Sequence, residues 1–578
     1  MQITGAELFV KALLTEKVDT LFAYPGGQAI DLFNALYGVE GLDVILPRHE
    51  QGLVHAADGY ARSTGKVGVC LVTSGPGATN LVTGIATANY DSVPLVCFTG
   101  QVPTHLIGND AFQEVDIVGI TRSISKYAVT VRRREDLGAV IKKAFYIAKS
   151  GKPGVVVVDL PKDIQQALGS DVYPQSIEIR GYKPNTAVHM GQIKKSLDCL
   201  KRAKHPIFLL GGGVNISHAN EAMTALVEKT GIPVVTTIMG KGAIPTNHPL
   251  YVGNLGIHGS YAANTAISEC DVLFSIGVRF NDRITGKVSE FAKRATIIHI
   301  DIDPASISRN IEVHIPIVAD AKNAITALLE KAPEFDFSEW RVRIGEWKEQ
   351  KPLEIQQISE SGVTPLAIIQ KINQIFSEAV ITTDVGQNQL WTTQFLELTN
   401  QKQMLTSGGL GTMGYGFPAA LGAKLGNPVK DVITICGDGG IQMNIQEMAT
   451  AIVYELPVII CILNNGYLGN VRQWQEMFFD KRYSSTCLRY RKSCTATCNT
   501  PSVCCPEYTP DFIRLAESYG AKAIRVRKQE EIETALLMAK NTKKVPTVIE
   551  FMIEREENVL PIVPPGNPLS DMIMGGNE

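Results

Sequence analysis

The sequence has little charge imbalance, no long apolar run and no sign of a secretory signal. Its 578 residues carry 55 basic and 58 acidic side chains, a formal net charge of −3. Such a chain lacks the basic field that attracts nucleic acid or an anionic membrane, and we expect neither as a partner. The apolar run 456–463 is well short of the roughly 20 residues that cross a bilayer. Since no basic stretch precedes an apolar run at the N-terminus, we expect a cytoplasmic protein with reduced thiols.

Short apolar runs alternate with helical patterns along the chain. The runs are continuous, so each strand would be buried on both faces, which is typical of parallel sheets covered by helices. Two stretches without this pattern, 166–190 and 332–363, are expected to be surface linkers. The sequence therefore predicts an α/β fold in three units, at 1–165, 190–330 and 365–565. The clearest predicted strands are Val67–Val72, Val155–Val158, Ile207–Leu210, Val272–Ile276, Val432–Ile435 and Val458–Leu463.

Two strand ends in the third unit carry oxygen ligands. One apolar run ends in Gly-Asp-Gly-Gly (437–440) and the next in Asn-Asn-Gly-Tyr (464–467). Because adjacent parallel strands lie about 5 Å apart, Asp438 and Asn465 would converge beside a helix N-terminus, which favours a phosphate. Mg²⁺ suits such a place, because it takes one or two protein oxygens plus phosphate oxygens. Either motif alone could be a tight turn, but their separation of 27 positions is that of one helix–strand unit.

This pair of motifs resembles the Gly-Asp-Gly…Asn-Asn signature of thiamine diphosphate enzymes, which have three doubly wound parallel-sheet domains. The resemblance implies that Asp438, Asn465 and the backbone carbonyl of Tyr467 hold Mg²⁺. It assigns a pyrimidine-binding domain to 1–165, a central domain to 190–330 and a diphosphate-binding domain to 365–565. The implied contacts of the last domain with thiamine diphosphate are Gln387, Asn388, Gly411, Gly437, Gly439, Gly440 and Met413, the last as the wedge that bends the coenzyme.

Glu50 is the candidate catalytic acid of the first unit. A lone glutamate at a predicted helix start could simply complement the helix dipole. The run Arg-His-Glu-Gln (48–51), followed by 56–62, resembles the family segment whose glutamate protonates the aminopyrimidine, with a pKa raised by burial. In the family this glutamate meets the metal site across a subunit interface, which implies a homodimer or tetramer. By the same resemblance Gly75 and Asn80 contact the coenzyme, and Gln113 lies beside the substrate.

The middle unit has several strand ends with glycine or polar residues. The run 207–213 departs from Gly-x-Gly-x-x-Gly at Ile216, and each strand end alone could be a capped turn. As a set they resemble the FAD site of acetohydroxyacid synthases, also called acetolactate synthases. The resemblance implies a structural FAD held by Lys152, His258, Arg279, Asp301 and Asp320.

The family resemblance covers residues 1–485 and 507–565 and implies a transferase of branched-chain amino-acid biosynthesis. Pyruvate would lose CO₂, and the hydroxyethyl carbanion would condense with a second pyruvate or 2-oxobutyrate. We expect Arg279 to hold a 2-oxo acid carboxylate and Trp474 to favour 2-oxobutyrate. Feedback control would need a separate small regulatory subunit. The alternatives are another thiamine diphosphate carboligase or 2-oxo acid decarboxylase, and a non-catalytic flavin-binding sensor.

A cysteine-rich insert at about 487–506 departs from the family pattern. Five of the eleven cysteines lie there, with the spacing C-x6-C-x3-C-x5-C-C. Thiolates at this density could bind Zn²⁺ or an iron–sulfur cluster. The alternative is a surface loop with reduced thiols, since the spacing matches no standard site. The five residues are Cys487, Cys494, Cys498, Cys504 and Cys505.

Overall fold

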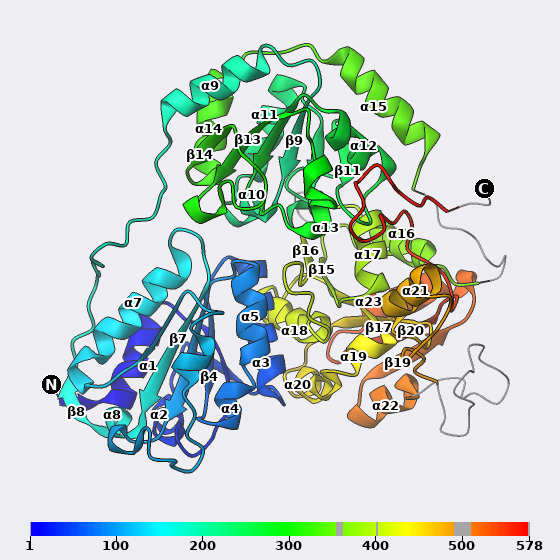
Figure 1. The fold of residues 1–578 in the computed structure, drawn as a ribbon. Helices are drawn as coiled ribbons and strands as arrows, with labels where there is room; N and C mark the ends of the chain where they lie inside the picture. The colour runs from blue at the N-terminus through cyan, green and yellow to red at the C-terminus, as the bar shows by residue number, and fades with distance from the viewer. Residues whose placement is uncertain (1, 354–361, 400–402, 490–509, 576–578) are drawn as a thin grey trace.

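The computed structural model describes residues 2–353, 362–399, 403–489 and 510–575. Three units, each built on a six-stranded parallel sheet with helices on both faces, lie at the corners of a triangle (Figure 1). The first unit is blue to cyan, the second green, and the third yellow to orange. The predicted α/β fold class is therefore confirmed.

The first sheet has the strand order β3-β2-β4-β5-β7-β6. Successive residues of its strands enter two different cores, one on each face. Leu71 packs on the side of helices α1 and α7, whereas Cys70 and Val72 pack on the side of α3 and α5. This is why the strand sequences are continuously apolar. The elements are α1 (Gly5–Thr15), β2 (Thr20–Ala23), α2 (Ile30–Leu36), β3 (Asp43–Ile45), α3 (Glu50–Thr64), β4 (Gly68–Val72), α5 (Val82–Tyr90), β5 (Leu95–Gln101), β6 (Tyr127–Thr130), α7 (Leu137–Lys149) and β7 (Val155–Pro161).

The middle sheet has the order β11-β10-β9-β12-β13-β14. Counted along the chain this is 3-2-1-4-5-6, so the strand order reverses between β9 and β12. The elements are α9 (Met190–Leu200), β9 (Pro206–Leu210), α10 (Gly212–Ile216), α11 (Asn220–Thr230), β10 (Val234–Thr236), β11 (Tyr251–Asn254), α12 (Tyr261–Glu269), β12 (Val272–Ile276), α13 (Asp282–Thr285), β13 (Thr296–Asp301), β14 (Ile315–Val318) and α14 (Ala321–Lys331).

The two predicted linkers are only partly linkers. Helix α15 (Ser338–Gln350) lies inside the second one and packs on the middle unit. Its Trp340 is 1% exposed and donates from Nε1 to the Pro206 carbonyl at 3.0 Å. The expectation of a surface crossing was wrong because the charged side chains hide an apolar face formed by Trp340, Ile344 and Trp347. At the start of the first linker, β8 (Leu168–Ser170) pairs with β1 (Gln2–Thr4).

The third sheet has the order β16-β15-β17-β18-β20-β19. Between β17 and β18 the chain forms a 3-10 turn (Ile445–Glu447) followed by α20 (Met448–Val453). After β20 the chain returns to the middle unit, where Val563 and Leu569 join the core. The other elements are α16 (Pro365–Ile375), β15 (Val380–Thr383), α17 (Gln387–Phe395), β16 (Gln403–Leu405), α18 (Gly416–Gly426), β17 (Val432–Gly437), α19 (Asp438–Ile441), β18 (Ile459–Asn464), α21 (Gly469–Phe478), α22 (Phe512–Tyr519), β19 (Lys522–Val526), α23 (Ile532–Asn541) and β20 (Thr547–Met552).

Helix α3 of the first unit packs directly on α18 of the third. Small residues let the two backbones touch: a Cβ on Gly59 would lie 2.1 Å from the Ala419 carbonyl oxygen, and one on Gly422 would lie 1.7 Å from that of Ala56. Any larger side chain would separate the helices, so this contact fixes the two units together. In the described part of the chain, no helix combines the length and apolar character needed to cross a membrane.

Candidate functional site

A cleft lies at the carboxyl ends of β15, β17 and β18 in the third unit. The parallel pairing of Gly437 with Leu463 brings Asp438 and Asn465 to the same sheet edge, as predicted. The amide of Gly466 donates to Asp438 Oδ2 at 3.1 Å, so the two loops are in direct contact. The adjoining cavity, about 80 Å³, is lined by Gln387, Asn388, Met413, Gly437, Asp438, Gly439, Gly440, Asn465 and Tyr467.

Two polar side chains of this cleft, Asp438 and Asn388, are buried. Asp438 is 2% exposed, and burial raises its pKa to about 7. The buried Oδ1 of Asn388 has no hydrogen-bond partner among the described residues. A buried carboxylate is costly unless it is paired or coordinates a metal, and an unsatisfied amide oxygen is rare. The donor set therefore fits a cation such as Mg²⁺ with an attached anion.

The glycine-rich loop Thr406–Tyr415 is held over this cleft by Asp384, a residue to which the sequence analysis assigned no role. The Asp384 carboxylate, which follows β15, accepts from the amides of Gly414 at 3.0 Å and Gly416 at 3.3 Å. Burial raises its pKa to about 6. These bonds place Met413, the residue before Gly414, in the lining of the cleft. Gly411 instead lines a neighbouring cavity.

Glu50 begins α3 in the first unit, and His49 caps the helix by accepting from the Gln51 amide. The Asn80 amide donates to Glu50 Oε2 at 2.9 Å. Gly75 and Gln113 meet nearby, since a Cβ on Gly75 would lie 2.8 Å from the Gln113 carbonyl oxygen. The structure thus brings Glu50 together with Asn80, and it brings Gly75 together with Gln113. It does not place Glu50 among the residues that line the Asp438 cleft of the same chain.

Glu447 of the third unit holds the loop that leads to Glu50, and no sequence motif points to this role. Its carboxylate accepts from the amides of Arg48 at 3.0 Å and His49 at 3.0 Å, and from the Thr450 hydroxyl at 2.7 Å. The side chain is fully buried, and burial raises its pKa. Only the fold brings these residues together, because 397 positions separate Glu447 from Glu50 in the sequence.

A second cavity, about 270 Å³, lies where the strand order of the middle sheet reverses. Ligands of open α/β sheets bind at such points, and the order 3-2-1-4-5-6 is typical of dinucleotide-binding domains. The backbones after β9 and β12 touch, since a Cβ on Gly213 would lie 2.7 Å from Gly277 Cα. Lys152, Arg279, Asp301 and Asp320 all line this cavity, as the sequence predicts for one site.

A third cavity, about 480 Å³, lies next to the other two. It shares Gly408 and Arg283 with the middle-unit cavity, and Val385 and Gly386 with the Asp438 cleft. Trp474 of α21 and His258 line it, and burial lowers the pKa of His258 to about 4. Arg283 lies over the Trp474 ring, with its guanidinium carbon 5.9 Å from the ring centroid. Arg279, the predicted carboxylate ligand, lines the middle-unit cavity and not the cavity that Trp474 lines. Arg283 was not among the site residues predicted from the sequence.

The cysteine-rich insert falls largely on positions that the structure does not describe. Cys487 alone is described, as a half-buried free thiol 4.0 Å from Arg555 Nη2. Within the described ranges, no group of three or more His, Cys, Asp or Glu side chains could hold a metal ion. Metal or cluster binding by the insert stays a prediction, since Cys494, Cys498, Cys504 and Cys505 lie outside those ranges.

Comparisons with known proteins match this arrangement of units. The first unit matches the thiamine pyrophosphate enzyme N-terminal TPP binding domain at 3–120, the second the central domain at 193–328, and the third the C-terminal TPP binding domain at 384–551. The chain is 44% identical to an acetolactate synthase large subunit of Buchnera aphidicola over 585 residues, covering 100% of this chain and 99% of the relative.

Two further relatives come from other organisms. A probable acetolactate synthase large subunit of Methanocaldococcus jannaschii is 45% identical over 582 residues, with 98% of this chain and 95% of the relative covered. The acetolactate synthase isozyme 3 large subunit of Escherichia coli (strain K12) is 42% identical over 590 residues, with 100% and 99% covered. The chain therefore belongs to the acetolactate synthase large-subunit family of thiamine pyrophosphate enzymes.

Proposed function

We propose that the chain is the catalytic subunit of an acetolactate synthase. It would decarboxylate pyruvate and join the two-carbon fragment to a second pyruvate or to 2-oxobutyrate, in branched-chain amino-acid biosynthesis. The observation that carries the proposal is the cavity of Trp474 and Arg283, which shares lining residues with the Asp438 cleft on one side and with the middle-unit cavity on the other.

The Asp438 cleft suits thiamine diphosphate, which when bound supplies an electron sink for the charge left by loss of CO₂. Asp438, Asn465 and the Tyr467 carbonyl would hold Mg²⁺. The buried Asp438 carboxylate, whose pKa burial raises to about 7, and the Asn388 oxygen without a partner among the described residues support this assignment. The diphosphate would lie against Gln387, Asn388, Gly437, Gly439 and Gly440, with Gly411 and Met413 beside the rings.

Glu50 would exchange a proton with the aminopyrimidine of a coenzyme held by a second copy of the chain. Its place outside the Asp438 cleft of its own chain supports a homodimer, in which each copy supplies one half of two sites. The Asn80 amide would orient the Glu50 carboxylate, and Gly75 and Gln113 would border the bound substrate. The relatives are named large subunits, which supports a separate small regulatory subunit as a further partner.

FAD is the proposed ligand of the middle-unit cavity, in a structural role without net redox change. The reversal point of the sheet, the close approach of Gly213 to Gly277 and the cationic Lys152 and Arg279 favour a dinucleotide with a pyrophosphate. Asp301 and Asp320 would contact it from the ends of β13 and β14, and His258 would lie toward the Trp474 cavity.

The carboxylate of the second 2-oxo acid would bind Arg283 rather than Arg279. Arg283 shares its cavity with Trp474, and its guanidinium can bond a carboxylate with two donors. Trp474 would pack against the alkyl group of 2-oxobutyrate, which is one methylene longer than that of pyruvate.

The test is an assay of the purified chain with pyruvate, thiamine diphosphate, Mg²⁺ and FAD. We expect two pyruvate molecules to disappear for each CO₂ and each acetolactate formed. Release of CO₂ without acetolactate would favour the alternative 2-oxo acid decarboxylase. Binding of FAD without any CO₂ release would instead favour a non-catalytic sensor.

A further inference from the structure

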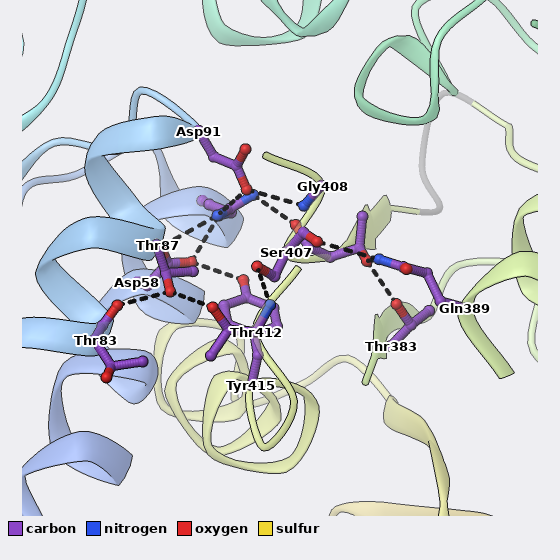
Figure 2. Close-up of polar contacts among 12 residues, drawn as sticks. Asp58, Thr83, Thr87, Asp91, Thr383, Gln389, Ser407, Gly408, Thr412 and Tyr415 are labelled. Carbon is purple, nitrogen blue, oxygen red and sulfur yellow. Dashed lines mark hydrogen bonds and ion pairs between the residues drawn. The ribbon is translucent and has the colours of Figure 1, made fainter. Parts of the chain in front are cut away.

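A buried ion cluster lies behind the glycine-rich loop Thr406–Tyr415, on the side of the first unit. Figure 2 shows its polar contacts running from Asp58 and Asp91 to this loop. Arg62 Nη2 lies 3.1 Å from Asp91 Oδ2, and Arg62 Nε lies 2.6 Å from Asp58 Oδ1. Neither carboxylate has any side-chain exposure. The proposed reaction uses none of these three groups.

Asp91 contacts both the glycine-rich loop and the proposed FAD cavity. Its Oδ2 accepts from the Gly408 amide at 3.1 Å. Its Oδ1 has no hydrogen-bond donor among the described residues, and Arg279 Nη2 lies 3.8 Å away. Asp91, Arg279 and Gly408 all line the FAD cavity. Five residues after Gly408 the same loop carries Met413 into the coenzyme cleft.

Gly409 fills the narrow space between Asp91 and Arg279. A Cβ on Gly409 would lie 2.6 Å from Asp91 Oδ1 and 2.8 Å from Arg279 Nη2. The loop backbone therefore lies against both members of the ion pair. A ligand that binds Arg279 would hold this ion pair, and therefore the loop, in one position. Binding at the FAD cavity would then change the affinity for a ligand at the coenzyme cleft.

We propose that Asp91 is a positioning residue that couples the two cofactor cavities, so that FAD bound at Arg279 tightens the binding of thiamine diphosphate beside Met413. This inference rests on the proposed function, which assigns these two ligands to their cavities. The coupling is reciprocal, so thiamine diphosphate must increase the affinity for FAD by the same factor.

The experiment measures two dissociation constants on the full-length protein. Thiamine diphosphate with Mg²⁺ is titrated by tryptophan fluorescence quenching, without FAD and with saturating FAD, and FAD is titrated in the reverse design. In the wild-type protein we expect saturating FAD to lower the dissociation constant of thiamine diphosphate by about fivefold or more, within the usual range of coupling between sites. Asp91→Asn keeps an acceptor for the Gly408 amide but removes the charge that pairs with Arg279, and we expect its coupling factor to fall toward one.

Two further variants separate coupling from a loss of structure. Thr87 lies on α5, which ends at Tyr90 just before Asp91. Thr87→Val removes a 2.7 Å hydrogen bond to Thr412 of the same loop, but Thr87 does not line the FAD cavity. We expect it to keep the wild-type coupling. Gly409→Ala inserts a methyl group between Asp91 and Arg279 at a half-buried position and should also abolish the coupling, even if Asp91→Asn does not fold.

The proposal is overturned if wild-type coupling is absent, or if Asp91→Asn and Gly409→Ala both retain it. A protein that binds no FAD would overturn the FAD assignment together with this inference. A protein that binds both cofactors without coupling would overturn the inference alone.

Discussion

Arginine assignments show how far a single residue can be interpreted from sequence. Arg279 and Arg283 occupy one short run, and both suit a carboxylate by residue type. Of the five residues predicted for the FAD site, Lys152, Arg279, Asp301 and Asp320 line one cavity, and His258 lines the neighbouring one. Asp301 ends β13, Asp320 caps α14 and Arg279 follows β12, whereas Lys152 comes from a loop of the first unit. The choice of Arg279 over Arg283 depends on the turn between them, and only the structure shows which guanidinium lies over Trp474.

Substituting each arginine in turn separates the binding of the 2-oxo acid carboxylate from the binding of FAD. We expect Arg283→Gln to raise the KM for pyruvate by roughly 10- to 100-fold, the loss of a charge-assisted hydrogen bond. Arg279→Gln should mainly weaken the binding of FAD, which is measured by quenching of flavin fluorescence. The reverse pattern, with pyruvate KM sensitive to Arg279→Gln alone, would restore the assignment made from the sequence.

His55 gives a prediction about pH. Its ring is fully buried against Tyr415, with centroids 5.5 Å apart, and burial lowers its pKa to about 3. In the unfolded chain it takes up a proton below about pH 6.5. Between pH 6.5 and 5 the unfolded state therefore binds the extra proton, and stability falls as the pH falls.

The measurement compares urea unfolding of the wild-type protein and His55→Leu at pH 6.5 and pH 5. Because the histidine of the unfolded chain is already half protonated at about pH 6.5, a full slope of about 1.36 kcal/mol per pH unit is reached only below that pH. We therefore expect the wild-type protein to lose about 1.5 kcal/mol more than the variant between pH 6.5 and pH 5. Equal losses would mean that His55 is protonated in the folded protein. The leucine is close to histidine in volume, so the packing against Tyr415 changes little.

At the scale of elements, the sequence predicts strands and the motifs at their ends, but it does not predict contacts between units that are distant in the sequence. The strands follow from continuous apolar runs because both faces of each sheet are covered. The Asp438 cleft follows from two strand-end motifs. Helix α15 was missed because its buried stripe of Trp340 and Trp347 lies in a charged sequence. Glu447 was missed because its partners are backbone amides of another unit, which have no signature of their own.

Glu447 is expected to set the position of the Glu50 helix. In Glu447→Gln one carboxylate oxygen becomes an amide group that cannot accept, so the Arg48 and His49 amides compete for the remaining acceptor. We expect kcat to fall by about 10- to 100-fold, as for a displaced catalytic group, with the KM for pyruvate little changed. Turnover and amide hydrogen exchange at 46–50 are measured together.

Tyr454→Phe is the matched control for this contact. It removes the 2.7 Å hydrogen bond from the Leu46 amide to the Tyr454 hydroxyl, in the same loop but four residues before Glu50. It should speed exchange at the Leu46 amide while leaving most of the activity. If both variants lose activity equally, the loop acts as a whole and Glu447 has no special role.

At the scale of the whole molecule, the question is whether Glu50 serves its own chain or its partner. Glu50→Gln and Asp438→Asn should each be inactive alone, the first for lack of the proton donor and the second for lack of the metal ligand. When the two chains are mixed in a dimer with shared sites, one site receives an intact Glu50 from one chain and an intact Asp438 from the other, while the second site receives both defects.

Random mixing of equal amounts produces half mixed dimers with one working site of two, which predicts about a quarter of the wild-type activity. If Glu50 acted within its own chain, every site would carry one defect and the mixture would stay inactive. The measurement is acetolactate formation after the two variants are unfolded and refolded together, compared with each refolded alone. Recovery of activity on mixing would also establish the dimer, because separate chains cannot share a site.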